Sequence, residues 1–503
     1  MKLRLVGHDY KYAVEQIMLS LFPDERPDYS DDCGNAPSEL VATSTLRLGK
    51  AFAQVSTTIS CGETIFRGTA RVHVSRLTDK IMTGRLLQRI VKQSFFRAAE
   101  GVIDAPPVWG SLTGIRPAHM AVSAIKGTGS VKAAIRTLTH EYYVSPSRAQ
   151  MCVQAAQMSI KLKETLSPVD IALYVGIPFC PTRCAYCSFV SNSVEKSFDL
   201  IEPFVQVLLN EIKTAGEMVK ASGLRVSSVY LGGGTPTALS EEDLDAVLSA
   251  LQSFFDLAYL REYTVEAGRP DTLTKPKLDI LHRHGVGRVC VNPQSMSDGV
   301  LNVIGRRHTA QDVLNAAHLV RQSGAALNMD IIAGLPSDTP SCFRHTIDEV
   351  LKLNPENVTI HTLSLKKGSR IMLEGTEIPS GSDVGLMLDY ASNRLCENGF
   401  SPYYLYRQKF TSGGFENTGW CLPGHEGIYN VCMMEELCSV LALGGGGVTK
   451  LVSEGGRIER IFNAKYPKEY ILFADKMKDK YEKIMRFMSM EEAVRHRHER
   501  DDY

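Results

Sequence analysis

Three cysteines near the middle of the chain carry the clearest chemical signal. Cys180, Cys184 and Cys187 lie in GIPFCPTRCAYCSFVSN with the spacing C-x3-C-x2-C. Cysteine thiolates are the usual ligands of iron–sulfur clusters, and a cubane 4Fe-4S cluster has four irons. Three cysteines therefore leave one iron open for the amino and carboxylate groups of S-adenosylmethionine (SAM). An electron from such a cluster cleaves SAM to a 5′-deoxyadenosyl radical, so the spacing predicts a cluster that activates SAM.

A zinc site and a coincidental grouping are the two alternatives for these cysteines. Structural zinc sites usually combine paired C-x2-C units or add a fourth Cys or His close by. The chain has no second C-x2-C pair. The motif also follows a predicted strand directly, and α/β folds build their sites at the carboxyl ends of strands. Both observations favour the cluster.

Other polar or glycine residues follow the predicted strands, or lie inside the cysteine loop. We take these as candidate SAM contacts: Tyr186, Gly233, Gly234, Thr235, Glu266, Gln294, Arg306 and Asp330. Singly, each is explained as well by a tight turn, a structural hydrogen bond or an ion pair. Together they predict one polar rim, because the carboxyl ends of parallel strands meet at the same edge. No catalytic side chain is predicted beyond the cluster and the SAM site.

The pattern of apolar residues divides the chain into three predicted domains: residues 1–167, 168–370 and 371–503. The first is α+β, with a hairpin formed by TLRLGKAFAQVSTT and TIFRGTARVHVS around Cys61-Gly62 and helices after it. The second shows six strand-then-helix alternations, which predict a parallel sheet with helical crossovers, either open or part of a barrel. The third is expected to be mostly helical or irregular, with an aromatic, glycine-rich stretch over 403–447 and a solvated helical tail.

The composition excludes several classes of protein. The 503 residues include 56 Lys and Arg against 56 Asp and Glu, so a general nucleic-acid binder is not expected. No signal peptide or apolar run of membrane-spanning length is visible, which predicts a cytoplasmic protein. In that compartment thiols stay reduced, so the twelve cysteines are expected to be buried thiols or metal ligands.

Taken together, the motifs resemble the oxygen-independent coproporphyrinogen III dehydrogenase group of radical SAM proteins. The strings that carry the resemblance run from about residue 170 to 450: YVGIPFCPTRCAYCSF, YLGGGTPT, VEAGRPD, VNPQSM, IGRRHT and NMDIIAGLP. ENTGWCLPGHEGIYN and the N-terminal extension ending in WGSLTGIRPAHM favour its HemZ-like branch. The resemblance implies an α/β fold with a radical SAM partial (β/α)6 TIM-type barrel. It also implies a SAM contact from Tyr174, beside those already named.

The implied activity is oxidative decarboxylation of two propionates of coproporphyrinogen III to vinyl groups, giving protoporphyrinogen IX. It requires an electron donor such as flavodoxin or ferredoxin. One departure keeps an alternative open. The best-known dehydrogenases carry a cysteine two positions after the third ligand, where this chain has Phe189. That departure resembles the heme-chaperone branch, whose members bind heme without dehydrogenase activity.

Several residues outside these motifs are weaker candidates. The backbone of Gly444–Gly447 could bind a propionate as an anion nest, or form a plain turn. His308 and His361 are explained most simply as hydrogen-bonded structural histidines. One further group could cover a tetrapyrrole or simply form a packed surface: Tyr403, Tyr404, Tyr406, Arg407 and Lys409. Another group could hold an auxiliary cluster or simply be buried thiols: Cys421, Cys432 and Cys438.

Overall fold

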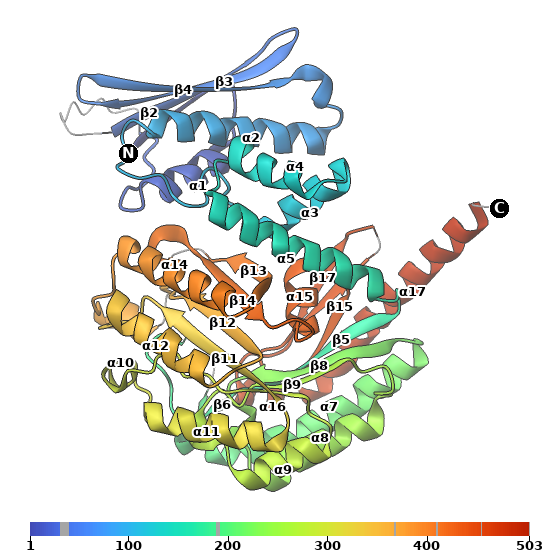
Figure 1. Cartoon of the computed structure of the whole chain (residues 1–503). Coiled ribbons are helices and arrows are strands. Elements are labelled where there is room, and N and C mark those ends of the chain that lie inside the picture. The colour runs from blue at the N-terminus through green and yellow to red at the C-terminus, as the bar shows by residue number, and fades with distance from the viewer. Residues whose placement is uncertain (31–39, 188–191, 367–368, 409–410, 454, 502–503) are drawn as a thin grey trace. The chain divides into compact units, whose positions relative to one another are not determined.

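The computed structural model describes residues 1–30, 40–187, 192–366, 369–408, 411–453 and 455–501. The chain divides into two compact units, which Figure 1 displays in the colours of the sequence. One unit comprises Met1–Val153 with Gly413–Phe415, and the other Gln154–Ser412 with Glu416–Tyr503. The division into three domains at residues 167 and 370 stays a prediction.

The first unit contains a four-stranded sheet in the order β1-β2-β3-β4. Its strands are β1 (Lys2–Val6), β2 (Leu40–Leu48), β3 (Phe52–Cys61) and β4 (Thr64–His73). The predicted hairpin at Cys61-Gly62 is confirmed, because Cys61 pairs with Thr64. The expectation of a single strand for TLRLGKAFAQVSTT was wrong. The chain turns after Leu48, where Gly49 and Lys50 interrupt the alternation of apolar residues, and two strands result.

Helices cover one face of this sheet. Alternate residues of β3 are buried, and they belong to one hydrophobic core with the apolar side of α2. The helices of this region are α1 (Lys11–Leu21), α2 (Lys80–Ala99), α3 (Pro117–Thr128) and α4 (Val131–Arg136). Helix α5 (Pro146–Thr165) begins in this unit and continues into the second one. Asp79 caps α2 by accepting hydrogen bonds from two backbone N–H groups. Pro117 stands at the start of α3, where its missing N–H is not needed.

The second unit contains the six predicted strand–helix alternations, and Figure 1 shows their helices around the strands. The parallel strands lie side by side in chain order: β5 (Asp170–Ile177), β8 (Arg225–Gly233), β9 (Glu262–Val265), β10 (Arg288–Cys290), β11 (Ala326–Ala333) and β12 (Asn357–Thr362). The intervening helices are α7 (Ile201–Ala221), α8 (Glu241–Phe254), α9 (Lys275–Arg283), α10 (Asp298–Val303), α11 (Ala310–Ser323) and α12 (Pro340–Lys352). Short elements complete this region: β6 (Phe179–Cys180), β7 (Asn192–Ser193) and α6 (Val194–Ser197).

The chain after residue 370 extends this sheet at both edges. The full order is β13-β14-β12-β11-β10-β9-β8-β5-β15-β16-β17. The added strands are β13 (Ser401–Arg407), β14 (Glu416–Cys421), β15 (Ser439–Gly444), β16 (Val448–Val452) and β17 (Ile458–Phe462). Within the described ranges, no ladder joins β12 to β5, so hydrogen bonds do not close the barrel. This region contains more strands than the sequence predicted. The backbone groups of β12 and β5 need hydrogen-bond partners, and no local sequence pattern indicates which segments provide them.

Helices also follow in this region, and the tail is not simply solvated. They are α13 (Arg370–Glu374), α14 (Gly381–Glu397), α15 (Ile428–Glu435), α16 (Pro467–Leu472) and α17 (Met477–Asp501). Tyr470 and Tyr481 are buried, and Lys480 Nζ donates to the buried Glu211 of α7 at 2.8 Å. The Tyr470 and Tyr481 hydroxyls donate to the same carboxylate. The first turns of the tail are therefore part of the core.

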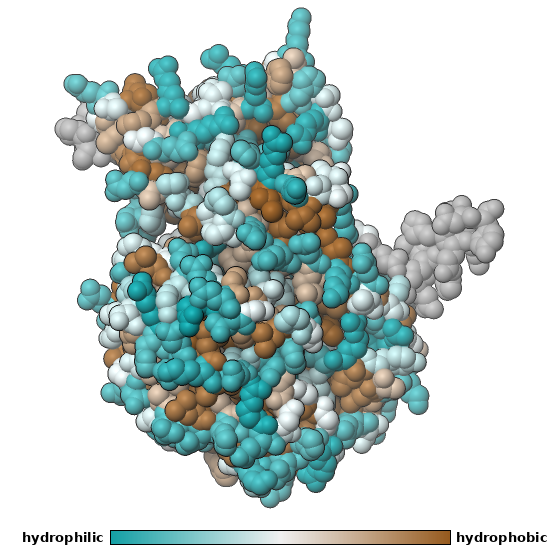
Figure 2. Space-filling model, in the orientation of Figure 1, coloured by the Kyte–Doolittle hydropathy of each residue, from teal (hydrophilic) through white to brown (hydrophobic). Residues whose placement is uncertain are grey.

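Charged and polar residues cover most of the face seen in Figure 2, and apolar residues appear there in separate small groups. Across the described part of the chain, no helix combines the length and the hydropathy that crossing a membrane requires.

Candidate functional site

The predicted cluster and SAM residues come together in one cavity. It measures about 580 Å³ and lies at the carboxyl ends of the parallel strands. Twelve predicted residues line it: Tyr174, Cys180, Cys184, Tyr186, Cys187, Gly233, Gly234, Thr235, Glu266, Gln294, Arg306 and Asp330. They come from several strands and their following loops, so the convergence expected from strand ends is present in the fold.

The three cysteines lie at and just after the end of β6. None of them forms a disulfide; Cys184 is buried, and Cys180 and Cys187 are partly exposed. The Thr235 hydroxyl donates to Cys180 Sγ at 3.5 Å, and Arg269 Nη1 lies 4.0 Å from Cys184 Sγ. A hydroxyl and a guanidinium beside thiols are suited to thiolate ligands, because both stabilise negative charge on sulfur.

A single metal ion is not favoured at these thiols. Across the described ranges, no three His, Cys, Asp or Glu side chains converge on a position for one ion. A cubane holds each cysteine on a different iron, so its thiolates stand farther apart than the ligands of one zinc ion. Three thiols with the sequence spacing C-x3-C-x2-C are the donor set of a cluster with one open iron, whereas structural zinc sites use four ligands.

The glycine turn after β8 packs against the strand that leads to the cysteines. The N–H groups of Gly234 and Thr235 donate to the carbonyls of Ile177 and Phe179, both at 2.7 Å. A Cβ on Gly234 would lie 2.4 Å from the Phe179 carbonyl oxygen. Glycine is thus required here by the close approach of two backbone segments, which places Thr235 beside Cys180.

Arg306 connects the cysteine loop to the far strands. It is buried, and its Nη1 donates to the carbonyls of Gly268 and Asn292 at 3.1 and 2.8 Å. Its Nη2 donates to the Tyr186 hydroxyl at 2.9 Å. Burial raises the pKa of Tyr186, so this phenol is neutral. Arg306 therefore holds the position of Tyr186, beside two ligands of the predicted cluster.

Glu266 is buried in the cavity wall and carries an unusual protonation equilibrium. It accepts hydrogen bonds from the Tyr230 hydroxyl and from Asn292 Nδ2, the latter at 2.9 Å. Burial, and then the negative charge of Asp330, raise the pKa of Glu266 to about 7, although the two hydrogen bonds oppose the rise. At neutral pH this carboxyl can exchange a proton or accept bonds from a ligand's hydroxyls.

Asp330 differs from Glu266 because a cation and two polar side chains surround it. Burial alone would raise its pKa, but His361, Asn328 and Thr359 hold the pKa below its ordinary value. Its Oδ2 lies 3.6 Å from His361 Nε2, and its Oδ1 accepts from Asn328 Nδ2 at 2.9 Å. The same carboxylate raises the pKa of His361 despite the burial of that ring. The pairing therefore favours an ionised Asp330 and a protonated His361 at this side of the cavity.

Polar atoms without partners mark the space that a ligand would fill. Gln294 has a φ of 65°, a strained conformation for a residue with a side chain, and its backbone bridges to β11. Within the described chain, its Oε1, Asn292 Oδ1 and Arg306 Nε are buried and make no hydrogen bond. Buried polar atoms in folded proteins nearly always have a hydrogen-bond partner. These three atoms could therefore form hydrogen bonds with a polar cofactor such as SAM.

Tyrosines line the remaining wall. The ring of Tyr429 stacks on those of Tyr230 and Tyr174, with centroids 4.4 and 6.0 Å away. Three tyrosines predicted from the sequence also line the cavity, together with His361: Tyr403, Tyr404 and Tyr406. Arg407 is not in the lining, and Lys409 lies outside the described residues, as does Phe189.

Two of the weaker candidates receive no support as ligand-binding groups, although Gly446 is part of the cavity lining. The N–H groups of Gly444, Gly445 and Gly446 donate to Glu211, Gly176 and Ala464, so they form a turn and not an open anion nest. His308 is buried outside the lining, but within the described chain neither of its ring nitrogens makes a hydrogen bond, so the expected hydrogen-bonded histidine is not found. Its pKa is lowered to about 4, mainly by burial and then by Arg306 and Arg269.

The idea of an auxiliary cluster receives no support. Cys421, Cys432 and Cys438 belong to a hydrophobic core, and Cys432 hydrogen-bonds to Cys438. They are buried thiols, the simpler of the two interpretations.

Local patterns did not single out Tyr230, Asn292, Arg269 or Tyr429. All four lie inside strings quoted above, YLGGGTPT, VNPQSM, VEAGRPD and ENTGWCLPGHEGIYN, so their position in a motif was an available signal. Tyr429 is fixed at the cavity by a long-range contact, in which its backbone N–H donates to Glu262 Oε2 at 2.8 Å. No short stretch of sequence indicates that contact.

Comparison with known proteins gives a consistent result. Residues 174–350 match the Radical SAM superfamily. The chain is 37% identical over 369 residues to the oxygen-independent coproporphyrinogen-III oxidase-like protein HemZ of Bacillus subtilis (strain 168), covering 72% of this chain and 74% of that protein. It is 25% identical over 302 residues to the heme chaperone HemW of Escherichia coli (strain K12), covering 60% and 75%.

Among solved structures, the fold is similar to that of coproporphyrinogen III oxidase (HemN) from Escherichia coli. The TM-score is 0.50 at 20% sequence identity, and the match covers 64% of this chain and 72% of that chain. The similarity supports the fold.

Proposed function

The chain belongs to the radical SAM family of oxygen-independent coproporphyrinogen-III oxidase-like proteins, and on that premise we propose that it is a coproporphyrinogen III dehydrogenase. The family uses a 4Fe-4S cluster and SAM as cofactors. The proposed reaction converts two propionate side chains to vinyl groups and yields protoporphyrinogen IX. Each conversion releases carbon dioxide, and one hydrogen atom and one electron leave the substrate.

One observation carries the proposal. The cavity that contains the three cysteines continues to a wall of tyrosines from β5, β8, β13 and α15. Flat aromatic rings suit a flat, largely apolar macrocycle, and the His361–Asp330 pair adds charge at the same wall. A single cavity can therefore hold the cofactor and a tetrapyrrole next to each other.

The residues have distinct proposed roles. Cys180, Cys184 and Cys187 hold the cluster, which with bound SAM supplies the radical that takes a hydrogen β to the carboxylate. The partnerless atoms around Gln294 and Arg306 receive polar groups of SAM. The remaining candidate contacts are Tyr174, Tyr186, Gly233, Gly234, Thr235, Glu266 and Asp330. An external donor of the flavodoxin or ferredoxin class supplies the electron.

The test is an anaerobic assay of the cluster-reconstituted protein with coproporphyrinogen III, SAM and dithionite. Mass spectrometry should detect decarboxylated porphyrinogen together with 5′-deoxyadenosine. Cys184→Ser should lose the iron–sulfur absorbance and both products. Cys396→Ser, at an exposed thiol on α14, is the matched control and should keep them. A Cys184→Ser protein with a full cluster would refute the ligand assignment.

The similarity to heme chaperones supports one second candidate. In that function the protein binds heme for delivery and does not decarboxylate a porphyrinogen. Cleavage of SAM without loss of carbon dioxide, combined with tight heme binding, would favour this function over the dehydrogenase.

A further inference from the structure

A second cavity opens at the opposite end of the parallel strands. It measures about 640 Å³, and its lining comes from the amino ends of β9, β10, β11 and β12, from the last turns of α5 and from the loop at 424–428. The predicted cluster and SAM residues are absent from its lining. In parallel α/β folds this end ordinarily serves stability, so a cavity of this size there is unexpected.

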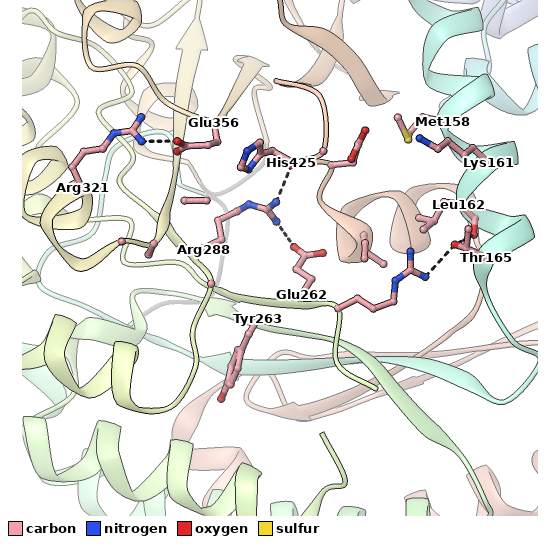
Figure 3. Close-up of a pocket in the computed structure, with 18 residues that line it drawn as sticks. Met158, Lys161, Leu162, Thr165, Glu262, Tyr263, Arg288, Arg321, Glu356 and His425 are labelled. Carbon is pink, nitrogen blue, oxygen red and sulfur yellow. Dashed lines mark hydrogen bonds and ion pairs between the residues drawn. The ribbon is translucent and has the colours of Figure 1, made fainter. Parts of the chain in front are cut away.

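Two ion pairs line this cavity, one mostly buried and one partly exposed. Arg288 Nη1 donates to Glu262 at 2.7 Å, and Arg321 Nη1 donates to Glu356 at 2.5 Å. Figure 3 shows the Arg288 and Arg321 guanidinium groups turned toward these carboxylates. Glu262 and Arg288 also line the SAM cavity, so this pair forms a partition between the two cavities.

Two cations at the outer part have no carboxylate partner among the described residues. The Arg261 guanidinium donates only to the Thr165 hydroxyl, at 3.1 Å. Lys161 forms no hydrogen bond or ion pair with any described residue, and the same is true of the His425 ring. Within the described lining, Glu426 is the one carboxylate outside an ion pair, so the outer part keeps an excess of one positive charge.

Part of the wall between these groups is apolar, and small residues lie beside it. Leu162, Ile428 and Met158 supply larger apolar side chains, and four small residues leave the backbone accessible: Gly287, Gly324, Ala325 and Ala326. A ligand with an apolar body could lie on this wall while its anionic groups reach the cations. Cations pair with carboxylates through charge-assisted hydrogen bonds, which are stronger than neutral ones.

We propose that this cavity is a second binding site for an organic ligand with an apolar body and at least two carboxylates. Lys161 and Arg261 bind the carboxylates, and the His425 ring supplies a further hydrogen bond. The site does not depend on the proposed dehydrogenase activity, because none of its outer residues lines the SAM cavity.

The probe is coproporphyrin III, a stable, fluorescent tetracarboxylate, titrated into the full-length protein with fluorescence anisotropy as the readout. The test variant is Lys161→Gln/Arg261→Gln. The control is Lys213→Gln/Lys220→Gln, which removes two positive charges from the exposed side of α7. One equivalent of probe should bind at least tenfold more weakly to the test variant than to the control. His425→Ala should weaken the same equivalent by a smaller factor.

The proposal fails if the test variant and the control give the same titration. Displacement of the probe by an equal concentration of citrate, which lacks an apolar body, would overturn the role of the apolar wall. Because the readout is binding, it separates this site from the catalytic proposal. A protein without decarboxylase activity that still loses one equivalent through Lys161 and Arg261 would keep the second site and reject the dehydrogenase.

Discussion

Replacement of Glu266 by glutamine is expected to stabilise the cofactor-free protein above pH 7. The folded state raises the pKa of this buried carboxyl from 4.5 to about 7. The protonated form is thus favoured in the folded state. The free energy of unfolding therefore falls as the pH rises above 4.5, and the fall is complete above about 7. At about 1.4 kcal/mol for each pH unit, the loss is about 3 kcal/mol.

The variant should remove this pH dependence with little change of shape. Tyr230 can rotate its hydroxyl to suit an amide, and Asn292 Oδ1, which has no partner among the described atoms, can accept from the new amide group if the Asn292 side chain turns over. His361 also loses stabilisation as the pH rises, because its folded pKa is raised above 6.5. Asp338, whose pKa is raised to about 6 by burial, loses stabilisation in the same pH range as Glu266, so the comparison of the variant with the parent is what isolates Glu266.

Urea denaturation at pH 5, 6, 7 and 8 provides the measurement. Trp109 lies in the first unit and Trp420 in the second, and both are buried. A Trp109→Phe background therefore restricts the fluorescence signal to the unit that contains Glu266. The difference in unfolding free energy between Glu266→Gln and the parent should grow from pH 5 to pH 8 by about 2.5 kcal/mol, because part of the total loss lies below pH 5. A constant difference across this range would show that Glu266 ionises normally and would refute the reasoning.

Two further predictions concern the support of the cavity. Lys480→Met should lower the free energy of unfolding of the second unit by about 3 to 5 kcal/mol, because it leaves the Glu211 carboxylate buried without its cation. The same fluorescence assay measures this loss. A loss below about 1 kcal/mol would contradict a buried pair. Gly419→Ala should destabilise the protein by about 1 to 3 kcal/mol and weaken porphyrin binding in the SAM cavity, because its Cβ would lie 1.9 Å from the Tyr404 ring. Gly127→Ala, at a helical position with nothing within 4 Å, is its control; it should not weaken porphyrin binding and should not destabilise the protein, because alanine is the better helix former.

Local patterns in the sequence were enough to predict the cysteine motif, the six strand–helix alternations and the residues at the strand ends. The cluster determines the spacing of its cysteines, and backbone geometry determines how often apolar residues recur in helices and strands. Both patterns can therefore be recognised within a short stretch of sequence. Parallel strands also have their carboxyl ends at one edge by construction. For that reason the order of strands along the chain is sufficient to predict Glu266 and Asp330 on the same rim as the cysteines.

Tertiary structure alone decided the contacts between distant parts of the chain. Strands β13 to β17 join the sheet at its two edges, where they provide hydrogen-bond partners for the backbone groups of β12 and β5. No short stretch of sequence indicates this pairing. Glu262 binds the backbone of Tyr429 and so fixes that ring against Tyr230, and Lys480 pairs with Glu211 although its helix is mostly polar. Burial and the pairing of polar groups depend on the whole fold. A metal-binding motif such as the three cysteines depends only on the spacing of residues within a short stretch of sequence. The sequence therefore determined the cofactors, and the fold determined which side chains surround them.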